Sequence, residues 1–374
     1  MSKHGRILVA MSGGIDSSLA AVLLHEQGYE VVGMTMKTWD YASSGGSKKE
    51  TGCCSLDSIN DARNVAVELG FPHFILDIRA EFGDAVIDYF TGEYLEGRTP
   101  NPCVMCNTHI KWDALLRRAD KLDCEFIATG HYANIREEGG GPSSRRFVIS
   151  KGVDTWKDQS YVLWGVSQES LARTKLPLGH LRKSEIRDMA RERGFIELVT
   201  KSESYEICFV PDNDYRGFLK RRIPTLEAEV AGGKFVDETG TVLGTHEGYP
   251  FYTIGQRKGL GIALGYPAFV TEIRKETNEV VLGRDRDGER DGMVVSRLNL
   301  SKYPRLDAPL ETVTKVRYKH DGTPATIEQV ADDRIEVRFH EPVTGIAPGQ
   351  AAVFYEGDDV VGGGWIMKSF RQAV

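Results

Sequence analysis

A glycine-rich turn near the start of the chain constrains its fold more than any other feature. Residues 12–18, Ser-Gly-Gly-Ile-Asp-Ser-Ser, follow a short apolar run over residues 7–11 and precede an amphipathic segment that ends at Gly28. This order predicts a strand, a tight turn and a helix. Adjacent glycines let the backbone approach a ligand without a Cβ clash, and the amides at a helix start attract an anion. The pattern therefore predicts a phosphate-binding loop.

The side chains of this turn indicate the kind of phosphate site. Ser12, Ser17 and Ser18 add hydroxyl donors, and Asp16 can hold a magnesium ion that bridges phosphates. A Walker A loop would continue with Gly-Lys-Ser/Thr, and that triplet is missing here. The turn resembles instead the Ser-Gly-Gly-x-Asp-Ser signature of the PP-loop ATP pyrophosphatases. Those enzymes cleave ATP between its α- and β-phosphates and attach AMP to an oxygen of their substrate, so the resemblance implies ATP and Mg²⁺ as cofactors.

Bulk properties narrow the class of protein. A chain of 374 residues exceeds a single core and should divide into two or three domains. No apolar run is long enough to span a bilayer, and the first residues lead straight into the first expected strand, which leaves no room for a signal peptide. Six cysteines in a chain of this size indicate cytosolic thiol chemistry rather than a disulfide scaffold. We therefore expect a cytoplasmic protein without membrane contact.

The first two hundred residues alternate between the strand and helix patterns. Such alternation predicts an α/β fold, a doubly wound parallel sheet with helices on both faces and ligands at the carboxyl ends of the strands. A loop, 137–146, reads as a hairpin tip, and a Gly/Ser/Lys-rich insert covers 43–49. The expected strands are 30–36, 73–78 and 125–129, and the expected helices are 56–69, 81–96 and 111–121.

The composition changes after Pro211, where glycine turns separate short β-rich pieces. A charged run over 285–291 marks a second boundary. Beyond it, several segments alternate at period two, as half-buried strands do, and fit a small barrel. We therefore predict a PP-loop domain over 1–213, a small, mostly β central domain over 214–289 and a C-terminal β-barrel over 290–374. The period-two segments are 313–318, 334–339, 351–355 and 360–367.

Three cysteines are candidates for reactive or metal-binding thiols. Cys103 and Cys106 are expected in a loop ahead of a helix, where a helix N-terminus would lower the pKa of a thiol. Cys208 lies far off in sequence but within the α/β region. The residues leave three interpretations open: a redox pair, although the thioredoxin-like setting is missing; a zinc or iron–sulfur site with three thiolates; or separate sulfur carriers.

A series of motifs then resembles one family over nearly the whole chain. In order they match the bacterial tRNA-specific 2-thiouridylases, a family of PP-loop enzymes. The motifs are residues 12–17, Asn101-Pro102-x-x-x-Cys106-Asn107, Gly130-His131-Tyr132-Ala133, Trp156-Lys157-Asp158-Gln159-Ser160-Tyr161, Glu206-Ile207-Cys208-Phe209 and residues 253–261.

The resemblance implies ATP-dependent 2-thiolation of the wobble uridine of tRNA. Adenylation would turn uracil O2 into part of an AMP leaving group. A persulfide on Cys208 would deliver the sulfur, Cys106 would complete the transfer, and the two thiols would end as a disulfide. The implied partners are tRNA and a cysteine desulfurase, acting directly or through a small sulfur-carrier protein, and the protein is expected to be a monomer.

The family's functional residues carry over onto matching positions. Met36 and Gly130 would contact the adenosine. Cys103 stands where the family commonly has Asp, which changes the group that approaches the target base. The phosphates would be held by Ala10, Met11, Ser12, Gly13, Gly14, Ile15, Asp16 and Ser17. The expected tRNA contacts are Asn101, Pro102, Cys103, Lys157, Asp158, Gln159, Arg317 and Tyr318.

Several of these residues also allow a purely structural interpretation. Arg317 and Tyr318 could form a solvated strand face, Asp158 could be a structural partner, and His131 is expected to orient a loop rather than to catalyse. Two other functions also compete. One is another PP-loop enzyme, such as a 4-thiouridine or lysidine synthetase or an amidating ligase, which would not need both Cys106 and Cys208. The other is an iron–sulfur scaffold that binds tRNA without catalysis.

Overall fold

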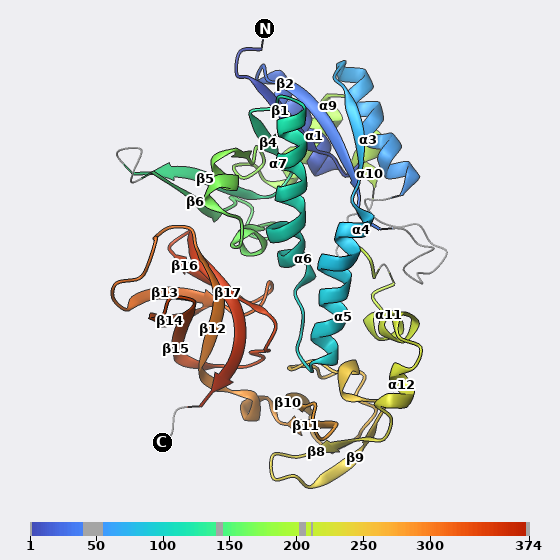
Figure 1. Ribbon diagram of the computed structural model, residues 1–374, viewed down its shortest axis with the longest axis vertical. Coiled ribbons are helices and arrows are strands. Elements are labelled where there is room, and N and C mark those ends of the chain that lie inside the picture. The colour runs from blue at the N-terminus through green and yellow to red at the C-terminus, as the bar shows by residue number, and fades with distance from the viewer. Residues whose placement is uncertain (1, 40–54, 140–144, 202–206, 211, 372–374) are drawn as a thin grey trace. The chain divides into compact units, whose positions relative to one another are not determined.

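The chain folds into two compact units that are not contiguous in sequence. The computed structural model describes residues 2–39, 55–139, 145–201, 207–210 and 212–371 (Figure 1). The first unit comprises Met1–Val86, Cys103–Asp214 and Asp358–Val360, and the second comprises Ile87–Pro102, Tyr215–Gly357 and Val361–Val374. The insert expected at 43–49 lies outside the described residues. The domain boundaries at 213 and 289 stay predictions.

A five-stranded sheet organises the first unit. Its order is β3-β2-β1-β4-β7, and every pairing in it is parallel. The predicted parallel sheet is thereby confirmed. Because the chain leaves β1 toward β2 on one side and reaches β4 on the other, the carboxyl end of β1 lies at the switch point where such sheets bind ligands. The strands are β1 (Arg6–Ala10), β2 (Glu30–Lys37), β3 (His73–Asp77), β4 (Phe126–Ala128) and β7 (Thr174–Lys175).

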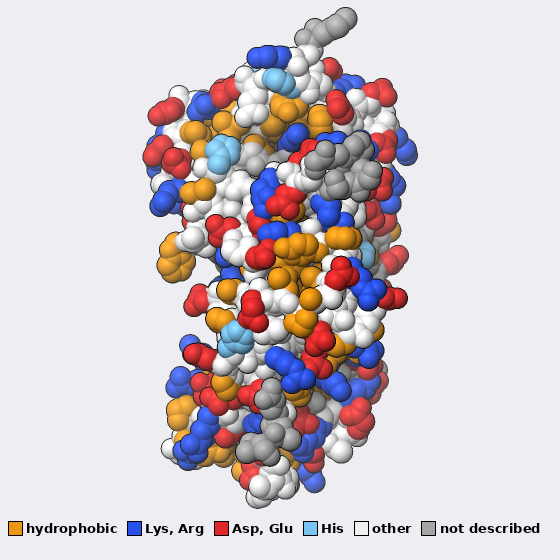
Figure 2. Space-filling view, turned by 90° about the vertical axis from the view of Figure 1, so that its left-hand side faces the viewer, with side chains coloured by type: hydrophobic (Ala, Val, Ile, Leu, Met, Phe, Trp, Pro, Cys, Tyr) orange, Lys and Arg blue, Asp and Glu red, His pale blue; other side chains and the backbone are white. Residues whose placement is uncertain are grey.

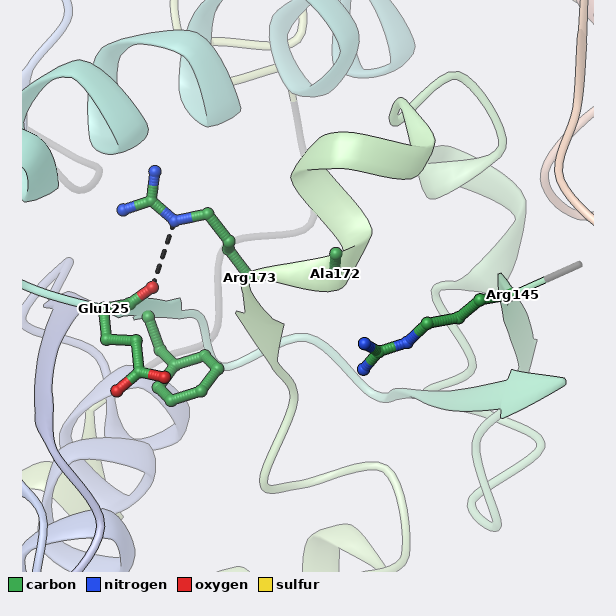
Figure 3. Close-up of a pocket in the computed structure, with 5 residues that line it drawn as sticks. Glu125, Arg145, Ala172 and Arg173 are labelled. Carbon is green, nitrogen blue, oxygen red and sulfur yellow. Dashed lines mark hydrogen bonds between the residues drawn. The ribbon is translucent and has the colours of Figure 1, made fainter. Parts of the chain in front are cut away.

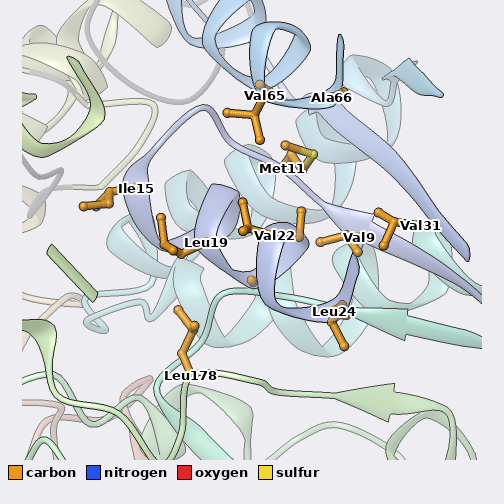
Figure 4. Close-up of a cluster of buried hydrophobic side chains, with 14 of the residues drawn as sticks. Val9, Met11, Ile15, Leu19, Val22, Leu24, Val31, Val65, Ala66 and Leu178 are labelled. Atoms are coloured by element: carbon orange, nitrogen blue, oxygen red, sulfur yellow. The ribbon is translucent and has the colours of Figure 1, made fainter. Parts of the chain in front are cut away.

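Helix α1 (Ile15–Glu26) carries the core of this unit (Figure 4). Leu19, Ala20 and Ala21 are fully buried, and Val9 of β1 packs in the same cluster. A helix that is apolar on nearly every side belongs in an interior rather than on a surface. The other helical elements are α3 (Leu56–Leu69), α4 (Arg79–Phe82), η1 (Gly83–Ile87), α6 (Pro102–Met105), η2 (Cys106–Lys111), α7 (Trp112–Lys121), η3 (Ser160–Leu163), α8 (Gln168–Ala172), α9 (Lys183–Glu192) and α10 (Ile196–Thr200).

Two helical stretches differ from the prediction. The helix expected over 81–96 is interrupted by the π-helical turn η1 before α5 (Asp88–Leu95). The loop expected around Cys103 and Cys106 is wrong, because α6, η2 and α7 follow one another without a break. Pro102 explains the difference: its fixed φ and missing N–H suit the first position of a helix, so it starts the helical run instead of holding a loop.

The hairpin expected around 137–146 is confirmed by its two flanking strands. β5 (Ala133–Glu138) pairs antiparallel with β6 (Arg146–Lys151), from Ala133 opposite Lys151 to Glu138 opposite Arg146. Among the described residues of the chain, no helix is long and apolar enough to cross a membrane.

The second unit contains a small mixed sheet of order β10-β11-β8-β9. The β11–β8 pairing is parallel and the other two are antiparallel. Its elements are α11 (Tyr215–Arg222), α12 (Leu226–Glu229), β8 (Gly233–Val236), β9 (Val242–His246), η4 (Tyr249–Phe251), β10 (Phe269–Arg274), β11 (Glu279–Gly283) and η5 (Asp285–Gly288).

A six-stranded antiparallel barrel follows in the same unit, as the period-two pattern predicted. Its order is β12-β15-β14-β13-β16-β17, and β12 also pairs with β17, which closes the barrel. Met293, Val337 and Phe354 lie in its core, each fully buried. The strands are β12 (Arg290–Leu300), β13 (Leu310–Lys315), β14 (Thr323–Ala331), β15 (Arg334–Val343), β16 (Ala351–Glu356) and β17 (Asp359–Phe370).

Helix α5 belongs to the second unit although it precedes much of the first in sequence. The rings of Phe90 and Phe218 meet edge to face at 5.8 Å, and Tyr94 stacks on Tyr215 at 4.7 Å. The hydroxyl of Tyr249 donates to the carbonyl of Leu95 at 2.6 Å. All of these partners lie more than one hundred residues further along the chain, so α5 is completed only by α11 and the segment that follows it.

Candidate nucleotide and thiol site

The loop after β1 is closed by its own serines. Ser17 Oγ accepts from the backbone N–H of Ser12 at 3.0 Å and donates to the carbonyl of Gly14 at 3.1 Å. Gly13 has a φ of +72°, and a Cβ placed there would lie 2.0 Å from the carbonyl oxygen of Ser58. Only glycine fits this position, because both the left-handed backbone and the neighbouring carbonyl exclude a side chain. The turn therefore lies directly at the N-terminus of α1, where an anion is favoured.

Two side chains from distant parts of the chain meet at Asp16. Lys183 Nζ lies 2.6 and 2.8 Å from the two carboxylate oxygens, and the hydroxyl of Tyr132 donates to one of them at 2.5 Å. Lys183 and Tyr132 are buried. Gly130 also abuts this point, since a Cβ there would lie 2.8 Å from the backbone of Asp16 and Ser17. The structure thus brings Asp16 and Gly130 together. It also shows a contact for Tyr132, a motif residue without an assigned role, and adds Lys183, which no motif contained.

The contacts of Asp16 with Lys183 and Tyr132, called here the Asp16 clamp, decide whether its carboxylate is available to the expected magnesium ion. Both carboxylate oxygens of Asp16 already interact with Lys183, and one also accepts from Tyr132. In the described part of the chain, no three His, Cys, Asp or Glu side chains gather as metal ligands. The loop amides and Lys183 suit phosphate oxygens, but the carboxylate as placed does not fit a directly bound Mg²⁺.

Removing the clamp's cation should destabilise the fold. Lys183→Met leaves the carboxylate of Asp16 without its ammonium, while Asp16 keeps 34% of its side chain exposed. A fully buried pair costs about 3–5 kcal/mol when one partner is removed. We expect a loss of about 2 kcal/mol here, because the exposure of Asp16 lowers that cost. Urea unfolding measures it, and the double variant Asp16→Asn/Lys183→Met should recover part of the loss. A single variant as stable as the wild type would contradict the coupling.

A second lysine ties the segment that leads to Cys208 to the phosphate loop. Lys201, directly after α10, donates to Asp61 at 2.5 Å and to Ser58 Oγ at 3.1 Å, and its Nζ lies 3.5 Å from the carbonyl of Gly13. Residues 202–206 lie outside the described residues. The chain that enters the Cys208 segment is therefore anchored beside the loop that the phosphates would occupy.

The two matched cysteines share one support. Cys106 begins η2, which packs against α4. Phe209, the residue after Cys208, is buried with its ring edge to face against Phe82 of α4 at 5.9 Å. Asn107 fixes η2 further by donating to the carbonyl of Val162 at 3.0 Å. One short helix thus holds both thiol-bearing segments within the first unit.

The cysteines of the described residues carry no disulfide. Cys103 and Cys208 are exposed, and Cys106 is half-buried. The disulfide that the family resemblance implies between Cys106 and Cys208 at the end of the transfer is absent from the described residues. Cys53 and Cys54 lie outside the described residues.

The expected lowering of the thiol pKa is wrong for Cys103. Desolvation by the surrounding protein raises its pKa, although the side chain keeps contact with solvent; Cys106 adds to the rise and Lys111 opposes it. Desolvation is the largest of these effects, and it outweighs the stabilisation expected from the helix N-terminus. Cys103 is thus a thiol with little thiolate character.

His131 orients a loop, as expected. Its Nδ1 lies 2.7 Å from Thr129 Oγ1, and its ring contacts Trp112. Burial, aided by the charge of Lys111, lowers the pKa of His131 to about 3. The imidazole is therefore neutral at every working pH, and it cannot act as an acid–base group that switches near neutrality.

The depressed pKa makes stability depend on pH. The pKa of His131 is near 6.5 in the unfolded chain and about 3 in the folded chain, so between these values the unfolded chain binds one more proton. The contribution is present above pH 6.5 and is lost as the pH falls toward 3. Urea unfolding across this window should show a weaker pH dependence for His131→Gln than for the wild type. The exposed His4→Gln serves as control, and an unchanged slope for His131→Gln would contradict the assignment.

Several expected RNA contacts already bond within the protein. Asp158 accepts from the backbone N–H groups of Gly152 and Ser160, and Gln159 Oε1 accepts from the N–H of Tyr132 at 3.0 Å. Arg317 and Tyr318 lie in a turn after β13, not on the strand face that the pattern suggested, because β13 ends at Lys315. Arg317 donates to the carbonyl of Thr344 at 3.1 Å and Tyr318 is 41% exposed.

The remaining expected contacts lie in one strand and at the start of a helical run. Met36 lies near the carboxyl end of β2, opposite Leu76 of β3. Asn101 precedes the helical run that carries Cys103 and Cys106, and Pro102 is its first residue. Roles in binding adenosine or RNA stay predictions for all of these residues.

A surface pocket of the first unit lies away from this site (Figure 3). Glu125 and Phe126 line it at the start of β4, together with Arg145 and Arg173, and Arg173 Nε donates to the carbonyl of Glu125 at 3.0 Å. Phe126 pairs with Ile7, whereas the phosphate loop follows Ala10 at the other end of β1. Ligands of parallel sheets bind at the carboxyl ends of strands, so this pocket is not the nucleotide site.

A parallel sheet whose central strand runs into a serine-lined glycine turn, without a Walker lysine, defines an ATP-using enzyme of the PP-loop class. Family models match three successive stretches. They are described as a tRNA methyl transferase HUP domain over residues 5–212, a tRNA methyl transferase PRC-barrel domain over residues 216–284 and an aminomethyltransferase β-barrel domain over residues 290–366.

Curated relatives match the chain from end to end. The tRNA-specific 2-thiouridylase MnmA of Cytophaga hutchinsonii is 73% identical, over 100% of both chains. The protein of the same name from Amoebophilus asiaticus is 71% identical, over 99% of this chain and 97% of the relative. The one from Salinibacter ruber is 58% identical over 98% and 95%. The chain therefore belongs to the tRNA-specific 2-thiouridylase family.

Solved structures match only loosely. A 4-thiouridine synthetase in complex with RNA and bound ATP is 17% identical over 60% of this chain and 52% of its own, with a TM-score of 0.36. At that score the likeness adds nothing to the argument above.

Proposed function

We propose that this protein uses ATP to replace O2 of the wobble uridine of tRNA with sulfur. The family supports the reaction, and the observation that carries its assignment to these residues is the link made by Lys201. That side chain bonds Ser58 and Asp61 beside Gly13 of the phosphate loop, at the entry to the segment that ends in Cys208. Activation by ATP and delivery of sulfur would therefore take place side by side.

The first step activates a poor leaving group. Uracil O2 attacks the α-phosphorus of ATP, pyrophosphate leaves, and the oxygen becomes part of an adenylate. We assign the phosphates to the amides of residues 10–17 and the adenosine to Met36 and Gly130. Lys183 supplies positive charge beside this loop, in the place of the missing Walker lysine. Magnesium would reach the site with the phosphates of ATP, rather than on Asp16 alone.

The second step moves one sulfur atom. The terminal sulfur of a Cys208 persulfide attacks C2 of the uracil, and AMP leaves with the former O2. The thiolate of Cys106 then attacks Sγ of Cys208, which breaks the bond to the transferred sulfur and releases 2-thiouridine. Cys106 and Cys208 are left oxidised as a pair, so a thiol reductant must supply two electrons before the next turnover. That oxidised pair is a transient of the cycle rather than a feature of the resting fold.

RNA binding would depend on local contacts. The chain has a net charge of −7, and Figure 2 shows Lys and Arg intermixed with Asp and Glu over the face in view. We assign tRNA contacts to Asn101, Pro102 and Cys103 near the target base, and to Lys157, Asp158, Gln159, Arg317 and Tyr318. Asp158 and Gln159 would act by shaping the backbone, since their side-chain oxygens accept bonds from protein amides. Side chains that meet phosphates position an RNA, and contacts to bases specify it.

The sulfur would come from a cysteine desulfurase, directly or through a small carrier protein, and both are consistent with an exposed Cys208. A cytoplasmic monomer remains our expectation.

One assay tests the reaction. The protein is incubated with unmodified tRNA, ATP, magnesium and a persulfide donor, and the digested nucleosides are weighed. A uridine heavier by the oxygen-to-sulfur difference, formed with AMP and pyrophosphate and eluting as the 2-thio isomer, supports the proposal. Elution as the 4-thio isomer would favour a 4-thiouridine synthetase. AMP without thiolated RNA would contradict the thiol relay, and neither product with a competent donor would contradict the proposed function.

A further inference from the structure

One tryptophan of this chain stands in water. The sequence has five tryptophans, and the structure describes all of them. Trp156 is 94% exposed, whereas the other four are between 1% and 5% exposed. An indole buries more apolar surface than almost any other side chain, and a fold that leaves one outside forgoes that gain. The four buried tryptophans are Trp39, Trp112, Trp164 and Trp365.

The turn that presents Trp156, residues 152–159, is held firmly. Asp154 Oδ1 accepts from the N–H groups of Trp156 at 3.1 Å and Lys157 at 3.2 Å, and its Oδ2 accepts from the N–H of Lys183 at 2.9 Å. At the other end, Asp158 accepts from Gly152 and Ser160. The indole therefore stands on a backbone that is already ordered, and a ligand that stacks on it would pay little entropy for binding.

The charge around the indole favours an anionic partner. Both carboxylates of the turn, Asp154 and Asp158, point their oxygens at protein N–H and hydroxyl groups. Lys157 follows Trp156, and the exposed Arg182 precedes Lys183, whose N–H is bonded to the turn. An exposed aromatic side chain on a turn that also carries Lys157, and that bonds the residue after Arg182, matches a nucleobase with its phosphates.

Hydrogen bonds also connect the turn to the candidate nucleotide site. Gln159 Oε1 accepts from the N–H of Tyr132, and the hydroxyl of Tyr132 donates to Asp16. Asp154 holds the N–H of Lys183, whose Nζ bonds the same Asp16. Tyr132 and Lys183, which both bond Asp16, thus also bond two residues of the turn, Gln159 and Asp154. A base on Trp156 would be positioned relative to the reacting phosphate.

We propose that Trp156 is a stacking platform for an unpaired base of the tRNA substrate, in the same single-stranded loop as the uridine that is thiolated. This proposal rests on the proposed function for the identity of the RNA. The site takes a nucleobase by its π-face, and Lys157 and Arg182 take the neighbouring phosphates.

The exposed tryptophan is its own probe. Because the other four tryptophans are buried, the emission that acrylamide quenches most readily comes from Trp156. An unmodified anticodon stem-loop should reduce that quenching, whereas a blunt RNA duplex of equal length should not. Protection by the duplex as well would reduce the site to phosphate binding and overturn stacking. Protection by a persulfide-carrier protein and not by the stem-loop would make the turn a protein-docking site instead.

Kinetics of variants test the role in turnover. Trp156→Ala should raise KM for tRNA about 5- to 150-fold, the effect of losing one base stack, while kcat and KM for ATP stay within about twofold. Trp156→Tyr should restore most of the loss. Val153→Ser, at an exposed apolar residue of the same turn, is the matched control and should bind tRNA as the wild type does. A fall in kcat without a change in KM would indicate a merely structural role. If stem-loop protection is seen and no thiolated uridine forms, stacking stands and the proposed function fails.

Discussion

Cys208→Ser is expected to reduce thiolation from a persulfide donor to background while tRNA-dependent formation of AMP continues. The serine hydroxyl cannot carry a sulfane sulfur, but nothing in the Asp16 clamp depends on Cys208, so the adenylate should still form. Thiolated nucleoside and AMP are measured from the same reaction. Cys124→Ser is the control, because Cys124 is buried and its thiol faces only the carbonyl of Leu122.

Cys106→Ser should fail at a later point. Without the second thiol, the sulfur bound to C2 stays linked to Cys208, so the RNA should accumulate as a covalent adduct with the protein. A small thiol reductant should release it as 2-thiouridine. The adduct is visible as a slow band in a denaturing gel. Full multiple turnover by either Cys106→Ser or Cys208→Ser would contradict sulfur transfer through these two thiols and would favour the reaction of another PP-loop enzyme.

Gly13→Ala is expected to lower kcat/KM for ATP by about 100-fold, the loss of rate that a displacement of about 1 Å causes at a reacting centre. The added Cβ would lie 2.0 Å from the carbonyl oxygen of Ser58, so the loop or the first turn of α3 must shift. The variant should also be less stable to unfolding by about 1–2 kcal/mol, because an L-residue at positive φ is strained. Steady-state kinetics with ATP and urea unfolding are measured together.

Gly70→Ala separates the two effects. Gly70 has a φ of +74°, close to that of Gly13, but nothing lies within 4 Å of the Cβ it would gain. It should lose the same stability as any alanine in this conformation and keep its kcat/KM for ATP. If both variants lower kcat/KM for ATP alike, backbone strain rather than the clash with Ser58 controls the loop.

The local parts of the site could be predicted from the sequence, and the long-range parts could not. The strand, glycine turn and helix around Gly13 and Gly14 are set by neighbouring residues, and the structure has them where the pattern put them. The clamp on Asp16 joins residues 116 and 167 positions apart. Lys183 opens an ordinary amphipathic helix, and only tertiary packing shows that its ammonium bonds Asp16 beside the glycine turn. Lys201 is hidden for the same reason.

Two misjudgements at shorter range have physical causes. The pair of prolines before Cys103 suggested a rigid loop, yet Pro102 starts a helix, since a first-turn residue needs no N–H. The period-two pattern through residues 313–318 suggested that Arg317 and Tyr318 lie on a strand. Val316 follows Lys315, the last residue of β13 that pairs with β16, and it is fully buried. It is apolar because it packs in the core at the turn, not because the strand continues.

The interrupted second unit has a consequence for synthesis on the ribosome. Helix α5 presents Phe90 and Tyr94 to partners at Phe218 and Tyr215. At a translation rate of about 5–20 residues per second, those partners emerge roughly 6 to 25 seconds after the helix. During that interval the aromatic face of α5 is uncovered while the sheet around β1 can already assemble. The nascent chain thus passes through a stage at which a chaperone that captures aromatic segments would find its target at residues 88–95, before any catalytic residue beyond them is complete.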